Sequence, residues 1–228
     1  MKEFATCLFG SQNYHLDLPA SDHDYVHIVT PDFDDFYNDR NLARAIQDDH
    51  NSSKDIRKFT SLLLKGNFNA IELLFSTDCI FHNDDAREYF RLAREGFGNG
   101  YLITVFPHFL HSVKGMAFAE NLPSRKQLAR AKFLSNFASY VLQRYAFCVS
   151  PRLWREPGIW GYPAAFRKEE QLYPDGTLTL GQIANEFSTI EDKARFYIDI
   201  YLPHFIDYAT QFERELANLT EKIVKKYI

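Results

Sequence analysis

Two short apolar runs near the N-terminus constrain the fold more than any other feature of this chain. Residues 3–9 are β-prone and stop at Gly10, and residues 24–30 stop at Pro31. Apolar runs of this length, bounded by Gly or Pro, are typical of strands, although such a short run is ambiguous by periodicity alone. We therefore expect two strands, with the polar loop over residues 12–21 between them.

Charged and small residues gather where these runs end. The loop follows Gly10-Ser11 and leads into Asp22-His23-Asp24. Alternate residues of a strand point to the same face and rise roughly 6.6 Å over two steps, so Asp22 and Asp24 on a strand can share one divalent metal ion. A Gly-Ser turn can offer backbone N–H groups to a phosphate. A phosphate-binding turn beside an acidic metal site indicates nucleotide chemistry.

Composition narrows the class of protein. The chain has 228 residues, 46% of them hydrophobic and 25% charged, which favours a globular protein with a substantial core. The net charge of −4 gives no global nucleic-acid signature, so nucleic acid would need a local basic patch. The three Cys residues match neither zinc spacing nor a secreted disulfide framework. With no run of about 18 apolar residues, we expect a cytoplasmic protein with no membrane partner.

The order of predicted strands and helices along the chain indicates an α+β fold. A core over residues 1–100, with a mixed sheet flanked by helices, precedes a mainly helical domain over residues 101–228. Polar residues 38–53 predict a loop or short helix, residues 32–37 a helical turn and residues 151–181 an irregular segment. A short strand is expected over residues 77–81, and helices are expected over residues 54–66, 69–75, 84–94, 101–120, 124–147 and 191–228, the last with a break at Pro203.

Several blocks resemble one known group of proteins. Gly10-Ser11, a spacer of about ten residues and Asp22-x-Asp24 resemble the signature of the DNA polymerase β-like nucleotidyltransferase superfamily. Residues 54–57 and 63–76 are similar to predicted nucleotidyltransferases of bacteria and large phages, in a group associated with RNA repair, and residues 30–37 are similar to the phage-type members. The likeness covers about residues 4–80 and is vague beyond residue 100.

The resemblance implies a fold, a reaction and its residues. The expected fold is a polymerase-β-like nucleotidyltransferase core. The expected reaction is Mg²⁺-dependent transfer of a nucleoside monophosphate from a nucleoside triphosphate to an acceptor hydroxyl, with release of pyrophosphate and two bound ions. Asp22, Asp24 and Asp55 would be the catalytic and metal-binding acids. Asp55 can instead be a carboxylate at a helix N-terminus.

Other residues are assigned to the nucleotide with alternatives left open. The backbone of Gly10 and the Ser11 side chain would bind the β- and γ-phosphates. Lys58 and Lys65 are candidates for nucleotide contacts, with a solvated helix face as the alternative. Glu72 is a reserve acid, and a partly buried ion pair with a Lys or Arg is the favoured alternative for it. A basic wall for triphosphate or RNA, or else a solvated face, is predicted at Lys114, Arg125, Lys126, Arg130 and Lys132.

The acceptor stays open at this stage. An RNA 3′ end is favoured over a protein hydroxyl or a small molecule, because the group resembled is linked to RNA processing. Two alternatives remain: a catalytically inactive NTP-binding or regulatory protein of the same fold, and an NMPylating toxin or anti-defence factor that modifies protein. The acidic net charge counts against RNA.

Overall fold

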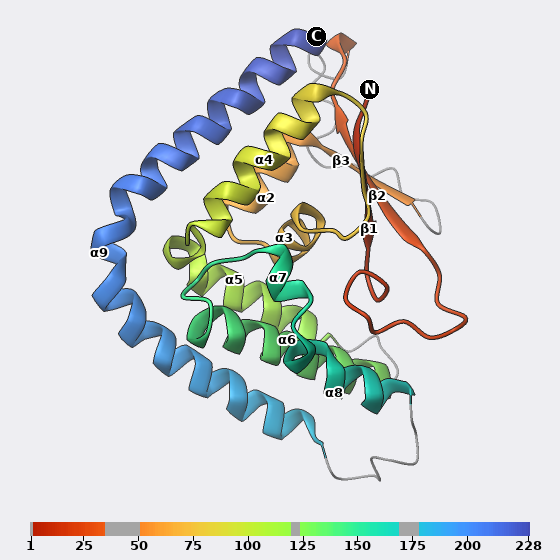
Figure 1. Ribbon diagram of the computed structural model, residues 1–228, viewed down its shortest axis with the longest axis vertical. Helices are drawn as coiled ribbons and strands as arrows, with labels where there is room; N and C mark the ends of the chain where they lie inside the picture. Colours follow the sequence, from red (N-terminus) through yellow and green to blue (C-terminus); the bar gives the residue numbers. More distant parts are fainter. Residues whose placement is uncertain (1, 35–50, 120–123, 169–177) are drawn as a thin grey trace.

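The chain forms a mixed sheet on one side and a larger set of helices on the other (Figure 1). The computed structural model describes residues 2–34, 51–119, 124–168 and 178–228. This arrangement confirms the α+β class predicted from the sequence. The predicted turn over residues 32–37 and loop over residues 38–53 lie largely outside the described residues.

The sheet has four strands in the order β3-β2-β1-β4. Strand β1 (Lys2–Phe9) pairs antiparallel with both β2 (Asp24–Thr30) and β4 (Cys79–Phe81), while β3 (Asn51–Asp55) runs parallel to β2. The two N-terminal strands and β4 confirm the predictions. Strand β3 corrects the prediction of a loop or short helix there.

Helices α2 (Ile56–Leu64) and α3 (Phe68–Leu74) lie between β3 and β4 in the chain, and α4 (Asp84–Gly98) follows β4. Each begins where a side-chain oxygen accepts a hydrogen bond from a backbone N–H of the first turn, as preferred N-cap residues do. The caps are Asp55, Asn67 and Asn83. The predicted helices over residues 54–66, 69–75 and 84–94 are confirmed with shifted ends.

The second half of the chain is helical. It comprises α5 (Leu102–Ala117), α6 (Ser124–Gln143), α7 (Pro151–Trp154), α8 (Pro157–Lys168) and α9 (Leu180–Tyr227). Two predictions are corrected: α7 and α8 lie within the stretch expected to be irregular, and α9 continues through Pro203. Helix α9 runs along the outer side of the other helices, and its end lies near the N-terminus (Figure 1).

A break in the chain is expected from the three glycines at residues 96, 98 and 100. Gly96 and Gly98 lie inside α4 instead, whereas Gly100, with φ +92°, lies between α4 and α5 as expected. A Cβ added to Gly96 would lie 2.1 Å from Cε2 of Phe212. Because no side chain could occupy that space, glycine at this position allows α9 to pack closely against α4.

Aromatic side chains dominate one continuous core that includes residues from both halves of the chain. Phe68 on α3 packs against Phe137 on α6 and Trp154 on α7, with ring centroids 5.4 and 6.0 Å apart. Burying a side chain of this size contributes roughly 1.5–3 kcal/mol. The abundance of Phe is therefore explained by the core. The division into two domains at residue 100 stays a prediction.

The cysteines also depart from expectation. Cys7 and Cys79 occupy paired positions on β1 and β4 and form a disulfide. They are 72 residues apart in the chain, so strand pairing brings together two residues whose sequence spacing gave no framework. Among the described residues, none of the helices has the length and apolar character needed to cross a membrane.

Candidate functional site

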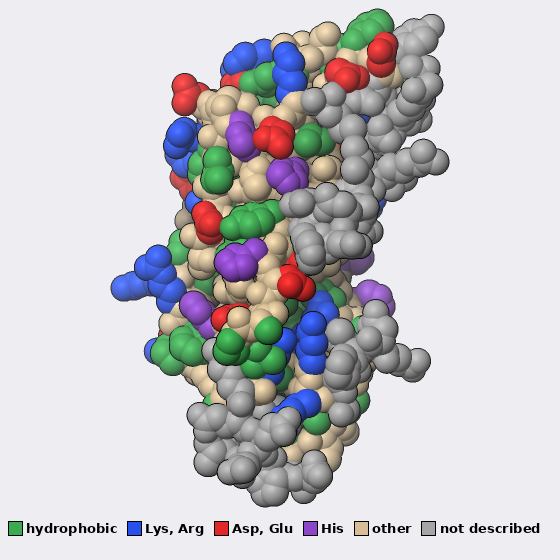
Figure 2. Space-filling view, turned by 90° about the vertical axis from the view of Figure 1, so that its right-hand side faces the viewer, with side chains coloured by type: hydrophobic (Ala, Val, Ile, Leu, Met, Phe, Trp, Pro, Cys, Tyr) green, Lys and Arg blue, Asp and Glu red, His purple; other side chains and the backbone are tan. Residues whose placement is uncertain are grey.

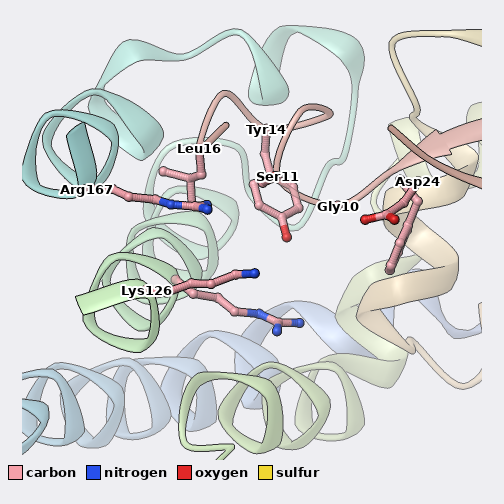
Figure 3. Close-up of a pocket in the computed structure, with 9 residues that line it drawn as sticks. Gly10, Ser11, Tyr14, Leu16, Asp24, Lys126 and Arg167 are labelled. Carbon is pink, nitrogen blue, oxygen red and sulfur yellow. The ribbon is translucent and has the colours of Figure 1, made fainter. Parts of the chain in front are cut away.

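A polar pocket of about 160 Å³ lies where the end of β1 faces the helices α6 and α8. The close-up places Asp24 on the sheet side, with Lys126 and Arg167 extending toward the pocket from the opposite, helical side (Figure 3). The lining residues are Phe9, Gly10, Ser11, Tyr14, Leu16, Asp24, Lys126, Arg130 and Arg167.

The turn after β1 forms one wall of this pocket. Gly10 has φ +83°, a conformation that favours glycine, and a Cβ at this position would lie 3.2 Å from Oδ2 of Asp24. The N–H of Asn13 donates to the Gly10 carbonyl at 3.0 Å, and the N–H of Leu16 donates to the Ser11 carbonyl at 2.8 Å. These bonds hold Ser11 in the pocket wall, and phosphate binding by Ser11 stays a prediction.

The backbone N–H of Gly10 already has a partner. It donates to Oε1 of Glu72 at 2.7 Å, so the expectation that this N–H would receive a phosphate is corrected. The alternative of a partly buried ion pair between Glu72 and a Lys or Arg is also corrected, because among the described residues its hydrogen bonds come from Gly10 and from Nδ2 of Asn13, the latter at 3.5 Å. The sequence carries no local signal for the contact between Gly10 and Glu72, because these residues are 62 positions apart in the chain.

Glu72 is fully buried, and its burial raises the pKa of its carboxyl to about 8. The hydrogen bonds from Gly10 and Asn13 and the nearby charge of Arg130 oppose this rise, while Asp24 adds to it. The carboxyl of Glu72 is therefore mostly protonated at neutral pH.

The structure separates the three acids expected to act together. Asp24 is the first residue of β2 and lines the pocket, whereas Asp22 lies exposed in the loop before β2. The alternation argument did not apply to Asp22 because the strand begins two residues later. Asp55 pairs in register with Val29, five residues along β2 from Asp24, which is roughly 16 Å at strand spacing.

Asp55 has a different set of contacts. Its carboxylate accepts from Nε of Arg57 at 3.0 Å and forms an ion pair with the Arg57 guanidinium at 2.6 Å. It also accepts from the backbone N–H of Arg57 as the N-cap of α2. These contacts match the alternative reading of Asp55 as a carboxylate at a helix N-terminus. Among described residues, no group of three or more His, Cys, Asp or Glu side chains is placed to hold a metal ion.

The helical side supplies positive charge. Lys126 and Arg130 lie four residues apart on α6, and side chains at that spacing share a helix face. Two of the five residues of the predicted basic wall therefore lie together at the pocket, and their role toward a triphosphate or RNA stays a prediction. Lys114 instead forms an ion pair with Glu191 at 2.7 Å, and Lys132 pairs with Glu186.

Arg167 was missed from the sequence because it lies on α8, in the stretch expected to be irregular. Burial lowers its pKa, and interactions with Tyr14 and Asp17 oppose that change. Pro157 at the first position of α8 was an available signal for a helix there.

Lys58 and Lys65, which were expected to contact the nucleotide, do not line the pocket. Lys58 lies on α2 and Lys65 directly after it, and both side chains are exposed.

An aromatic residue forms the inner surface of the pocket. Tyr14 is buried and stacks on Phe133, with ring centroids 4.6 Å apart and an interplanar angle of 21°. Burial raises the pKa of the Tyr14 hydroxyl, so this phenol is neutral at physiological pH. The pocket therefore combines an aromatic inner wall with charged groups on two sides.

The surrounding surface has mixed charge. In the space-filling view, Lys and Arg side chains lie at the top, at the left edge and in the lower centre, and Asp, Glu and His side chains are interspersed among them (Figure 2). No family model, curated protein or solved structure matches this chain.

Proposed function

We propose that the chain is a Mg²⁺-dependent nucleotidyltransferase that binds a nucleoside triphosphate in the pocket beside the Gly10–Ser11 turn. It would transfer the nucleoside monophosphate to an acceptor hydroxyl and release pyrophosphate. One observation supports this above all: Asp24 faces the cations Lys126, Arg130 and Arg167 across a pocket whose wall carries Ser11.

The charge balance of the lining favours a polyanion. Three cationic side chains face one carboxylate, and Tyr14 is neutral. A triphosphate carries several negative charges, and charge-assisted hydrogen bonds from Arg to phosphate oxygens are among the strongest in proteins. The Ser11 hydroxyl can donate to the same group. The cations would neutralise the charge that develops on the departing pyrophosphate.

Asp24 and Asp22 are the acids that would hold Mg²⁺. This ion is usually held by one or two carboxylates together with substrate phosphates. Asp24 lies in the pocket, and Asp22 lies two residues earlier in an exposed loop. We assign Asp24 as the principal ligand and Asp22 as the second, and omit Asp55. The bound metal would supply charge neutralisation and acidify the attacking hydroxyl.

The acceptor is proposed from the resemblance rather than from the pocket. An RNA 3′ end is the first choice, and a cytoplasmic location is proposed together with it. A protein hydroxyl is the acceptor if the chain is an NMPylating toxin or anti-defence factor. NTP binding without transfer identifies the inactive, regulatory alternative.

A labelled-nucleotide assay tests the proposal. The chain is incubated with each of four α-³²P-labelled NTPs, Mg²⁺, an RNA oligonucleotide with a free 3′-OH, and separately a cell extract. Label in RNA is the expected result, whereas label in protein supports the modifying alternative. Asp24→Asn removes the charge while keeping the side-chain shape, and it should abolish incorporation. If the wild type neither binds nor transfers any NTP, the proposal is overturned.

A further inference from the structure

Two buried side chains hold the Gly10–Ser11 turn from inside the protein. Oε1 of Glu72 on α3 accepts from the Gly10 N–H at 2.7 Å and from Nδ2 of Asn13 at 3.5 Å. Glu72 and Asn13 are 0% and 1% exposed, so water does not compete for these bonds. The turn is therefore hydrogen-bonded to α3 through two of its own residues, Gly10 and Asn13.

Asn13 extends the connection to a third segment. Its Oδ1 accepts from the backbone N–H of Thr77 at 2.9 Å and from the Thr77 hydroxyl at 3.2 Å. Both ends of the Asn13 amide are thus engaged, one with Glu72 and one with the segment that leads into β4. Hydrogen bonds at Oε1 of Glu72 and at both ends of the Asn13 amide restrict the local geometry of the turn.

We propose that Glu72 is a positioning residue that holds the Gly10–Ser11 turn in the place where a bound phosphate meets Ser11. This inference rests on the proposed function. It gives Glu72 a role in substrate binding that needs no contact with the substrate and no metal.

The proposal explains why a carboxyl group is buried here. An apolar residue at position 72 would leave the Gly10 N–H without a partner, and an unpaired buried donor is costly. The same turn places Gly10 against Asp24, with only 3.2 Å between a Cβ at Gly10 and Oδ2 of Asp24. A displaced turn would therefore change both the position of Ser11 and the space around Asp24.

The charge state of Glu72 also suits a phosphate pocket. Burial favours its neutral form, so little negative charge lies beneath the turn at neutral pH. The charged or titratable groups around it are Arg130 on α6, Asp24 on β2 and Tyr14 in the turn itself. Its second oxygen, Oε2, has no hydrogen-bond partner in the described part of the chain.

Amide exchange tests the contact itself. In the wild type, NMR should find the Gly10 N–H protected from hydrogen exchange. Glu72→Leu removes the acceptor while retaining side-chain volume, and should speed exchange at Gly10 about tenfold, the factor that one lost hydrogen bond corresponds to. Glu72→Gln retains an acceptor oxygen and should restore protection. Equal exchange rates in the wild type and Glu72→Leu overturn the proposal.

Steady-state kinetics test the consequence for substrate binding. Glu72→Leu should raise KM for the NTP about tenfold with kcat changed no more than about twofold, since binding is lost equally before and in the transition state. Glu72→Gln should recover most of that KM. A purely structural role would instead lower the folded fraction, which reduces apparent kcat and leaves KM unchanged.

Ile71→Val is the matched control, because it mildly destabilises the same helix through a fully buried neighbour. It should leave KM unchanged. A tenfold rise in KM in this control as well would overturn the assignment of Glu72. If the wild type transfers no nucleotide, the proposed function fails, whereas a normal KM in Glu72→Leu with an active wild type defeats only the positioning role.

Discussion

Asp24 and Asp55 lie toward opposite ends of the β2–β3 strand pair. Asp24 is the first residue of β2, while Asp55 is the last residue of β3 and pairs with Val29. Strand geometry places them roughly 16 Å apart, too far for both to bind one ion or one pair of closely spaced ions. The two acids therefore have separable roles, one in the pocket and one at the start of α2.

We predict that substitution of Asp24 reduces nucleotide transfer, whereas substitution of Asp55 reduces stability. Asp24→Asn should reduce nucleotide transfer at least 100-fold with little change in stability. Asp55→Ala should lower the free energy of unfolding by about 2 kcal/mol, since it removes an N-cap and leaves Arg57 without its carboxylate. Urea unfolding and initial transfer rates measure the two effects. Loss of transfer in a fully folded Asp55→Ala protein would restore Asp55 to the site.

The strands could be predicted where local sequence decides structure. Residues 3–9 and 24–30 are apolar and are followed by Gly10 or Pro31, and both became strands at about these bounds. Strand β3 could not be predicted because its sequence, Asn-Ser-Ser-Lys-Asp, has neither apolar alternation nor β-prone residues. Its strand conformation comes from parallel pairing with β2, which is a tertiary effect.

The candidate site was only partly predictable for the same reason. Ser11 and Asp24 belong to a local pattern, and both line the pocket. Arg167 was not assigned because Pro163 and the nearby glycines indicated an irregular segment, although Pro157 at the start of α8 favoured a helix. The role of Glu72 depends on Gly10, 62 residues earlier, and only packing of α3 under the turn reveals it.

The cations of the pocket should determine NTP affinity. We predict that Arg130→Ala and Arg167→Ala, whose side chains are partly buried, each weaken NTP binding about 10- to 100-fold, as expected for the loss of hydrogen bonds to a charged group. Lys126→Ala should have a smaller effect because Lys126 is exposed and its charge is screened. Isothermal titration calorimetry at low and high salt measures these affinities.

Lys58→Ala and Lys65→Ala are the matched charge-removing controls for this series. Both lysines are exposed and do not line the pocket, so each variant should bind the NTP as the wild type does. If these controls weaken binding as much as Arg130→Ala does, affinity reflects net charge rather than the pocket.

Glu72 should make stability depend on pH. Its pKa is about 8 in the folded protein against 4.5 ordinarily, so between these values the folded state holds a proton that the unfolded state has released. The free energy of unfolding should therefore fall as pH rises across this window, by up to about 1.4 kcal/mol per pH unit from this group. Below about pH 4.5 both states are protonated and the slope from Glu72 disappears.

Comparison with Glu72→Gln isolates that contribution. The variant cannot ionise, so its unfolding free energy, measured by urea denaturation from pH 5 to 8, should lose this slope while slopes from other groups remain. The difference in unfolding free energy between the wild type and Glu72→Gln, plotted against pH, therefore reports the titration of Glu72. A constant difference across the range would show that the carboxyl of Glu72 titrates at an ordinary pKa.

Two glycines within helices should respond in opposite directions to the same substitution. Gly96→Ala on α4 should lower the free energy of unfolding by about 1–3 kcal/mol, because the new methyl group would overlap the ring of Phe212 on α9. Gly115→Ala on α5 meets nothing within 4 Å and should raise stability by up to about 1 kcal/mol through helix propensity. Thermal unfolding of both variants measures the contrast. If Gly96→Ala were as stable as Gly115→Ala, α9 would not pack against α4 as closely as described, and the place of α9 along the other helices would need revision.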